Sequence, residues 1–292
     1  MMKWRKMPAG EYGKVKTFLM EREKYCVAAC ARFLRINENR GHVWYLDQYC
    51  RGASGGPENE LNAILLHSRH TLFPVFDEDI KIPGPRFLNR FLGKVKIHAI
   101  QGLLQAAEPL EVLMENQGYF AAERIDYHLM SLDAGLSPGA APLRVLKSGP
   151  SGLVLRKPAP EDEESLFALQ AAYEQEEVLP VNSAFDPVSC RLNLKRIISS
   201  EQIILAEFDG QVVGKINTSA KSFTRYQIGG VYVRPDCRGL GIGIKMTSFF
   251  CESLLAQGKG LTLFVKKRNA AAAKVYRKAG FSVSADYRIS YY

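Results

Sequence analysis

The segment from Gln227 to Gly243 constrains the fold most, because a strand pattern there changes directly into a glycine-rich loop and then a helix pattern. Residues 227–233 are rich in β-branched and aromatic side chains, and residues 244–255 carry apolar side chains at helical spacing. The loop between them, residues 238–243 (RGLGIG), has glycine at every second position. Without β-carbons there, N–H groups at the helix start can approach an anion. The segment predicts an α/β fold with either a phosphate-binding loop or a tight turn that binds nothing.

This loop differs from two common nucleotide-binding motifs. A P-loop continues with lysine and then serine or threonine, whereas Ile244 and Lys245 follow Gly243 here. In the dinucleotide fingerprint the third glycine comes three residues after the second, but here it comes two residues after it. The loop therefore indicates a third type of phosphate site, if it binds phosphate at all.

A second motif follows at a suitable distance. Residues 261–265 (LTLFV) are typical of a strand, and the frame N-x-x-A-x-x-x-Y-x-x-x-G-F then begins at Asn269 and places a tyrosine at Tyr276. Taken alone, this frame is also compatible with an ordinary helix that carries an alanine face and a half-buried tyrosine. The order of the two motifs, joined by a helix and a strand, argues against coincidence.

Together the two motifs resemble the signatures of the GNAT (Gcn5-related) N-acetyltransferase family. The first strand and turn contribute Val231, Tyr232, Val233 and Pro235 to this resemblance. It implies a mixed, mostly antiparallel sheet, flanked by helices, whose two central strands splay apart. It also implies acetyl-CoA as co-substrate, no metal, and transfer of the acetyl group to a primary amine by direct attack in a ternary complex.

The resemblance also implies roles for individual residues. Tyr276 matches the general acid that protonates the departing thiolate, although a tyrosine that merely packs on pantetheine is the alternative. Many family members carry a glutamate on the strand where this chain has Gly229 and Gly230, so Glu176 and Glu177 are the candidate bases, or else a solvated helix end. Gly229 and Gly230 favour a bulge that frees an N–H for the oxyanion. The residues expected to bind the cofactor are Val231, Tyr232, Val233, Arg238, Gly239, Leu240, Gly241, Ile242, Gly243, Asn269 and Tyr276.

The N-terminal half repeats the order of a GNAT unit in a looser way. Two helices within residues 11–34 precede strands at 42–49, 61–67, 71–76 and 94–100, a helix, and a closing strand at 127–132. Only Gly102 stands where a phosphate loop would be expected, so we predict that this half cannot hold CoA. The chain resembles a bacterial two-domain type, with a degenerate GNAT-like domain at 1–135, a linker at 136–150 and the acetyltransferase domain at 151–292. A structural α+β domain of other ancestry is the alternative for the first half.

The distribution of charge indicates which kind of partner the chain binds, and the cysteines indicate its cellular compartment. The net charge of +9 is concentrated after residue 233, where 11 Lys and Arg face 3 Asp and Glu, on the segment expected to hold an anionic cofactor. The cations expected to serve its phosphates are Arg234, Arg238, Lys245, Lys266, Lys267, Arg268 and Lys274, unless part of them forms a solvated basic face. Six scattered cysteines, without a leader or a membrane-length apolar stretch, predict free thiols in a cytoplasmic protein.

Two other functions compete with catalysis. A non-catalytic CoA-binding sensor or scaffold would explain the missing strand glutamate. Nucleic-acid binding would use the basic surface, but aromatic and basic residues do not alternate along any predicted strand face. The acceptor, a small-molecule or peptide amine, is not encoded in a motif, and the oligomeric state stays open, with a homodimer as one option.

Overall fold

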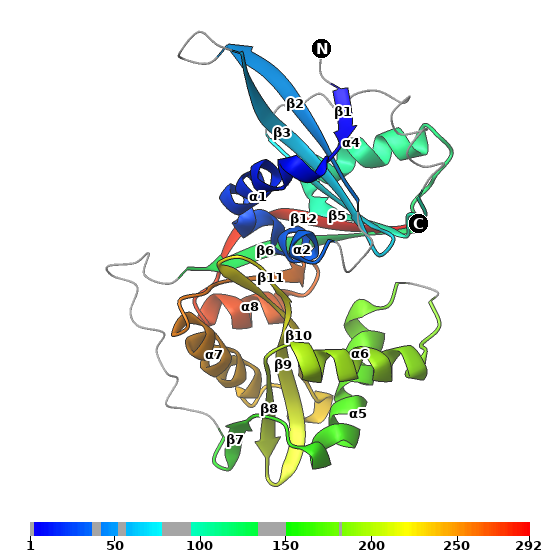
Figure 1. The fold of residues 1–292 in the computed structure, drawn as a ribbon. Coiled ribbons are helices and arrows are strands. Elements are labelled where there is room, and N and C mark those ends of the chain that lie inside the picture. Colours follow the sequence, from blue (N-terminus) through cyan, green and yellow to red (C-terminus); the bar gives the residue numbers. More distant parts are fainter. Residues whose placement is uncertain (1–2, 37–41, 52–56, 78–94, 134–149, 181–182) are drawn as a thin grey trace. The chain divides into compact units, whose positions relative to one another are not determined.

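The computed structural model describes residues 3–36, 42–51, 57–77, 95–133, 150–180 and 183–292, which form two compact units. Unit 1 contains the residues up to His128 together with Ala285–Tyr292, and unit 2 contains Leu129–Ser284. Both combine a mostly antiparallel sheet with helices, so the predicted α/β class is confirmed (Figure 1). No helix in these ranges is both long and apolar enough to cross a membrane.

In unit 1 the sheet order is β1-β2-β3-β4-β5-β12-β6. Its elements are β1 (Lys3–Lys6), α1 (Tyr12–Glu21), α2 (Glu23–Leu34), β2 (His42–Arg51), β3 (Pro57–Ser68), β4 (Thr71–Phe76), β5 (Ala99–Leu103), α4 (Leu104–Glu115), β6 (Glu123–Leu132) and β12 (Ser282–Tyr291). Side chains alternate between the faces of β3, so Ala63 and Leu65 pack in a cluster with α4, while Ile64 and Leu66 are buried on the opposite face. The two predicted N-terminal helices are confirmed.

The predicted strand at 94–100 begins later, at Ala99, because the backbone before it is hydrogen-bonded to the end of β3 and to the turn that follows it. The Lys96 carbonyl lies 3.1 Å from His67 Nε2, and the His98 N–H donates to the His70 carbonyl at 2.7 Å. At its other end β5 passes directly into α4, from Leu103 to Leu104, without a connecting loop. Unit 1 therefore has no counterpart of a glycine-rich phosphate loop at this junction.

The last strand of the chain does not pair within the domain to which the sequence assigned it. The prediction assigned residues 284–291 to the C-terminal domain, but β12 pairs antiparallel with β5, Tyr287 opposite Leu103 and Tyr291 opposite Ala99. Residues Leu129–Leu132 of β6 belong to unit 2 instead, where β6 is the neighbour of β11. Most of the predicted linker, residues 136–149, lies outside the described residues.

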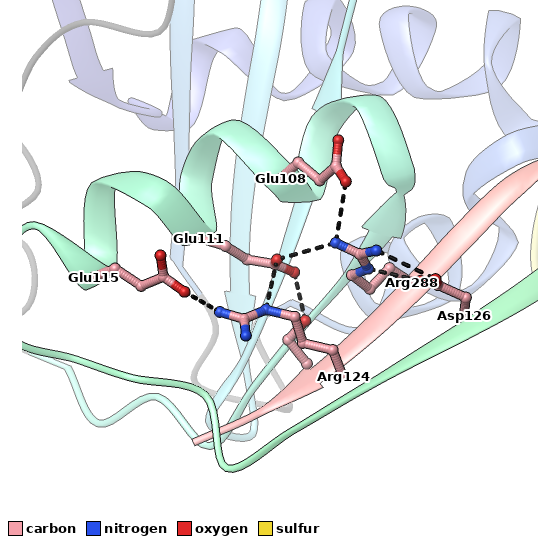
Figure 2. Close-up of polar contacts among 7 residues, drawn as sticks. Glu108, Glu111, Glu115, Arg124, Asp126 and Arg288 are labelled. Atoms are coloured by element: carbon pink, nitrogen blue, oxygen red, sulfur yellow. Dashed lines mark hydrogen bonds and ion pairs between the residues drawn. The ribbon is translucent and has the colours of Figure 1, made fainter.

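An ionic network holds β12 in unit 1 (Figure 2). Glu111 of α4 is only 3% exposed and accepts hydrogen bonds from Ser290 Oγ and, at 3.0 Å, from Arg124 Nε. Arg288 of β12 donates from Nε to Asp126 at 2.7 Å and lies 3.4 Å from Glu111. A buried carboxylate needs such partners to offset its lost hydration. The network thus fixes α4, β6 and β12 to one another.

Within unit 2 the strand order is β6-β11-β10-β9-β8-β7. Its elements are β7 (Leu153–Arg156), α5 (Glu163–Tyr173), a π-helical segment (Glu174–Val178), α6 (Pro187–Ser200), β8 (Ile203–Phe208), β9 (Gln211–Lys221), β10 (Arg225–Val233), α7 (Ile242–Leu255), β11 (Gly260–Lys266) and α8 (Ala270–Lys278). Helices α7 and α8 cover one face of this sheet and α5 and α6 the other (Figure 1). The hairpin predicted at Asp209-Gly210 joins β8 to β9, with positive φ at both residues.

Candidate acyl-CoA site

The glycine loop forms an uncovered backbone surface at the start of α7. Gly239 and Gly241 have φ values of +83° and +82°, and no atom lies within 4 Å of where a β-carbon would stand on either. Helix α7 begins at Ile242, and its first N–H groups have no partner within the helix. These N–H groups and the helix dipole favour an anion. The loop can therefore receive a phosphate without displacing a side chain.

Strand β10 separates from β11 beside this loop. The two strands pair in parallel only from Arg225 to Ile228, although β10 continues to Val233. On its other edge, the register with β9 shifts between Gly229 and Tyr232, so Gly230 and Val231 together face a single β9 residue. Gly230 has φ +58°. The predicted splay and bulge are thus confirmed, and backbone groups after Ile228 are released from β11.

A cavity of about 480 Å³ joins the loop, the splayed part of β10 and α8. Its walls come from three sets of residues: the π-helical segment, the β10–α7 connection, and α8 with its cap. They are Glu176, Glu177, Val231, Tyr232, Val233, Cys237, Arg238, Gly239, Gly241, Ile242, Gly243, Ile244, Asn269, Ala271, Ala272, Lys274, Val275, Tyr276 and Lys278. The fold therefore gathers residues separated by about a hundred positions in the sequence around one cavity.

Tyr276 lies in the wall of the cavity with its ring packed edge-on against Phe281, at 6.2 Å between centroids. The residue is 8% exposed. Burial, with a smaller contribution from Tyr173 and Glu177, raises the pKa of Tyr276 well above the ordinary phenol value. The phenol therefore keeps its proton and can donate it.

Glu176 lies at the cavity but is paired with the loop arginine. Its carboxylate accepts from Arg238 Nη2 at 2.8 Å, and Arg238 Nε donates to the Val233 carbonyl at 3.0 Å. The Arg238 guanidinium holds the pKa of Glu176 below its usual range, while burial and Glu176 raise the pKa of the neighbouring Tyr232 phenol. In this arrangement Glu176 is a weaker base than a free glutamate.

Glu177 is held by two partners, Lys266 and Asn269. It lies 3.3 Å from Lys266 Nζ and accepts from Asn269 Nδ2 at 3.0 Å. Asn269 also caps α8, because its side-chain oxygen accepts from the Ala272 N–H at 2.9 Å. The asparagine of the sequence motif thus has a structural task in addition to its place in the cavity wall.

The structure brings together all the predicted site residues except Leu240, whose side chain is 48% exposed and absent from the wall. Of the predicted phosphate-binding cations, Arg238 and Lys274 line the cavity, whereas Arg234 is engaged with Asp236 at 2.6 Å. The sequence analysis missed Lys278, which follows Lys274 by one helical turn on α8. Residues four apart lie on the same face of a helix, so the spacing of Lys274 and Lys278 could have predicted this position.

Lys215 was missed as well. It lies on β9 with no exposed surface, and its Nζ donates to Asn217 Oδ1 at 3.1 Å and to the Gly230 carbonyl at 2.9 Å. The only sequence signal was a lysine within the apolar alternation of residues 211–216 (QVVGKI). Burial lowers the pKa of Lys215 to about 7, and Glu174 and Cys190 oppose that shift.

Comparison with known proteins identifies this region. The model of the acetyltransferase (GNAT) family matches residues 166–281, which contain all the residues of the cavity wall. No curated protein sequence matches the chain.

Similar solved structures extend over the whole chain. A protein of Drosophila melanogaster is 12% identical, with a TM-score of 0.64, and the match covers 99% of this chain and 98% of that one. A tandem GNAT protein from the clavulanic acid biosynthesis pathway is also 12% identical, with a TM-score of 0.59 and the same coverage. A GCN5-related N-acetyltransferase from Sphaerobacter thermophilus is 17% identical, with a TM-score of 0.57 over 99% of this chain and 94% of that one. At these identities the likeness shows the fold.

Proposed function

We propose, from the premise that residues 166–281 belong to the acetyltransferase (GNAT) family, that this protein transfers an acetyl group from acetyl-CoA to a primary amine. The amine would attack the thioester directly while both substrates are bound. The observation that carries the proposal is the cavity in which an open glycine loop, the stretch of β10 that no longer pairs with β11 and the buried Tyr276 phenol meet. We further propose that unit 1 is a degenerate GNAT-like domain, because β5 enters α4 without a phosphate loop.

The chain offers a separate group for each part of the cofactor. The N–H groups of residues 239–243 would hold the diphosphate, with Arg238 and Lys274 adding positive charge. Backbone groups of Val231 and Val233 would pair with the pantetheine as an added strand, since β11 no longer occupies them. Asn269 would contact the cofactor from its place in the wall.

Two groups would act on the acyl transfer itself. The Val231 N–H, in the bulge, would stabilise the oxyanion that forms when the amine attacks the carbonyl carbon. As the carbon–sulfur bond breaks, Tyr276 would donate its proton to the leaving thiolate. The phenol is protonated at neutral pH, which this role requires, while its raised pKa makes the proton harder to donate.

The base that accepts the proton of the amine would be a carboxylate of the π-helical segment. Glu176 and Glu177 line the cavity, and π-helical segments often occur at functional sites. Their ion pairs with Arg238 and Lys266 oppose this role, so one pair would have to open when substrates bind. Cys26, Cys30, Cys190, Cys237 and Cys251 are free thiols, which supports a reducing, cytoplasmic location.

The first experiment is calorimetry with acetyl-CoA, followed by an assay of CoA release with a set of small-molecule and peptide amines. We expect binding, and release of CoA with at least one amine. Absence of binding at millimolar acetyl-CoA would overturn the proposal. Binding without turnover by any amine would point to a sensor or scaffold instead.

The second experiment is Tyr276→Phe, which keeps the ring and removes the proton. We expect unchanged acetyl-CoA affinity and a fall in kcat of about 10²- to 10⁴-fold, the usual contribution of a general acid. Tyr226→Phe is the matched control, because Tyr226 lies in the paired part of β10 and outside the cavity wall. Equal kcat in wild type and Tyr276→Phe would assign the acid role elsewhere.

A further inference from the structure

The buried amine of Lys215 is attached to one particular peptide of the cavity wall. Its Nζ donates to the carbonyl of Gly230 at 2.9 Å. That carbonyl belongs to the peptide whose N–H is carried by Val231, a residue of the cavity wall. The described backbone has no cis peptide bond, and a trans peptide directs its C=O and N–H to opposite sides. The Val231 N–H therefore points away from Lys215.

The same peptide is not held by the regular sheet. Gly230 and Val231 fall in the register shift between β10 and β9, and the pairing of β10 with β11 has already ended at Ile228. A bulge interrupts the regular ladder of backbone hydrogen bonds, so the sheet fixes the orientation of this peptide less strictly. Lys215 holds the peptide on the carbonyl side.

We propose that Lys215 is a positioning residue for acyl transfer, which holds and polarises the Gly230–Val231 peptide so that the Val231 N–H meets the thioester carbonyl. The inference rests on the proposed function and names a residue that acts through the backbone. A hydrogen bond to the carbonyl of a peptide strengthens its N–H as a donor. The effect is largest when the amine is protonated.

The Lys215 amine occupies the space that a side chain at position 230 would need. A β-carbon on Gly230 would stand 2.1 Å from Asn217 Oδ1 and 2.7 Å from Lys215 Nζ, and the backbone has φ +58° there. Any side chain at this position would therefore displace the amine or its partner. Asn217 and the buried amine together leave no room for a side chain at Gly230.

Burial of the Lys215 amine destabilises the fold, which argues that the lysine has a role besides packing. An amine without exposed surface has lost its hydration, and in return it has two hydrogen bonds and the Tyr173 ring, 4.9 Å from Nζ. The ionisable groups that interact with it are Glu174 of the π-helical segment and Cys190 of α6. A methionine would fill the same volume without the desolvation cost.

The test uses Lys215→Met, with Lys221→Met on the same strand as the matched control. Lys221 is partly exposed and bonds to the Ser200 carbonyl, away from the cavity. We expect Lys215→Met to bind CoA like wild type but to lose most of the wild-type preference for acetyl-CoA over CoA, because only acetyl-CoA carries the thioester carbonyl that the Val231 N–H would bind. We also expect kcat to fall about 10-fold or more, with the KM for the amine unchanged, since losing an oxyanion donor costs about 10²- to 10³-fold.

A second measurement does not depend on the folding of a variant or on turnover. In wild-type protein the ¹⁵N shift of the Val231 amide should titrate with a midpoint near the pKa of Lys215, about 7. Absence of that inflection, or a Lys215→Met enzyme with wild-type kcat and acetyl-CoA preference, would overturn the inference. A wild type that fails to bind acetyl-CoA would instead refute the proposed function, while the amide titration would still report on the link between Lys215 and Val231.

Discussion

Replacing Lys215 with methionine should change how the stability of the protein depends on pH. Burial lowers the pKa of this lysine from 10.5 to about 7 in the folded protein. Between these two values the unfolded chain binds a proton that the folded chain does not, so the unfolding free energy of wild type rises with pH. Below pH 7 both states are charged and the burial cost is fully present, and above pH 10.5 both are neutral and the cost is absent.

The size of the effect follows from the pKa difference. A difference of about 3.5 pH units corresponds to about 5 kcal/mol, gained at about 1.4 kcal/mol per pH unit. The variant lacks this gain, so wild type should become about 4 kcal/mol more stable relative to Lys215→Met between pH 7 and pH 10. The variant also leaves Asn217 Oδ1 and the Gly230 carbonyl without a donor, at about 1–3 kcal/mol each. That second cost is independent of the lysine charge and shifts the whole curve without changing its slope.

The assay is urea denaturation of both proteins at intervals from pH 6 to pH 10, with the difference in unfolding free energy plotted against pH. Other titrations occur in both proteins and largely cancel in the difference. Lys221→Met is the matched control, because Lys221 lies on the same strand with a side chain that is 30% exposed to water. A difference curve for Lys215→Met with no slope between pH 7 and pH 10 would refute the reasoning, because it would mean that Lys215 titrates alike in both states.

Three further predictions concern the loop, the cavity and unit 1. Gly241→Ala should cost about 1–2 kcal/mol of stability, because alanine is strained at φ +82°, and should weaken acetyl-CoA binding measured by calorimetry; unchanged affinity would place the diphosphate elsewhere. Glu176→Gln should tighten CoA binding a few-fold at low salt, because Arg238 is released from a half-exposed ion pair; weaker binding would contradict this competition. Arg288→Met should destabilise unit 1 by about 3 kcal/mol, seen as faster hydrogen exchange in α4, because Glu111 stays buried with one cation fewer; unchanged exchange would count against the network.

The sequence predicted the local elements of unit 2 well, for a physical reason. The turn at Asp209-Gly210 and the loop at 238–243 each depend on the backbone preferences of a few adjacent residues. Strand β5 shows the limit, since its start is set by hydrogen bonds to His67 and His70, some thirty residues earlier. The sequence could not predict that the last strand, β12, pairs with β5 of unit 1. The partner of a strand depends on contacts between residues that are distant in sequence.

The sequence by itself determined that residues 227–281 carry a strand, a glycine loop, a helix, a second strand and the motif that begins at Asn269, and it named most of the cavity wall. Only the tertiary structure decided that β12 completes the sheet of unit 1 and that Lys215 lies beneath the bulge of β10. The physical reason is the range of the interactions: backbone torsions and helix caps act within a few residues. Burial of an amine and the choice of a strand partner arise only when distant segments pack together.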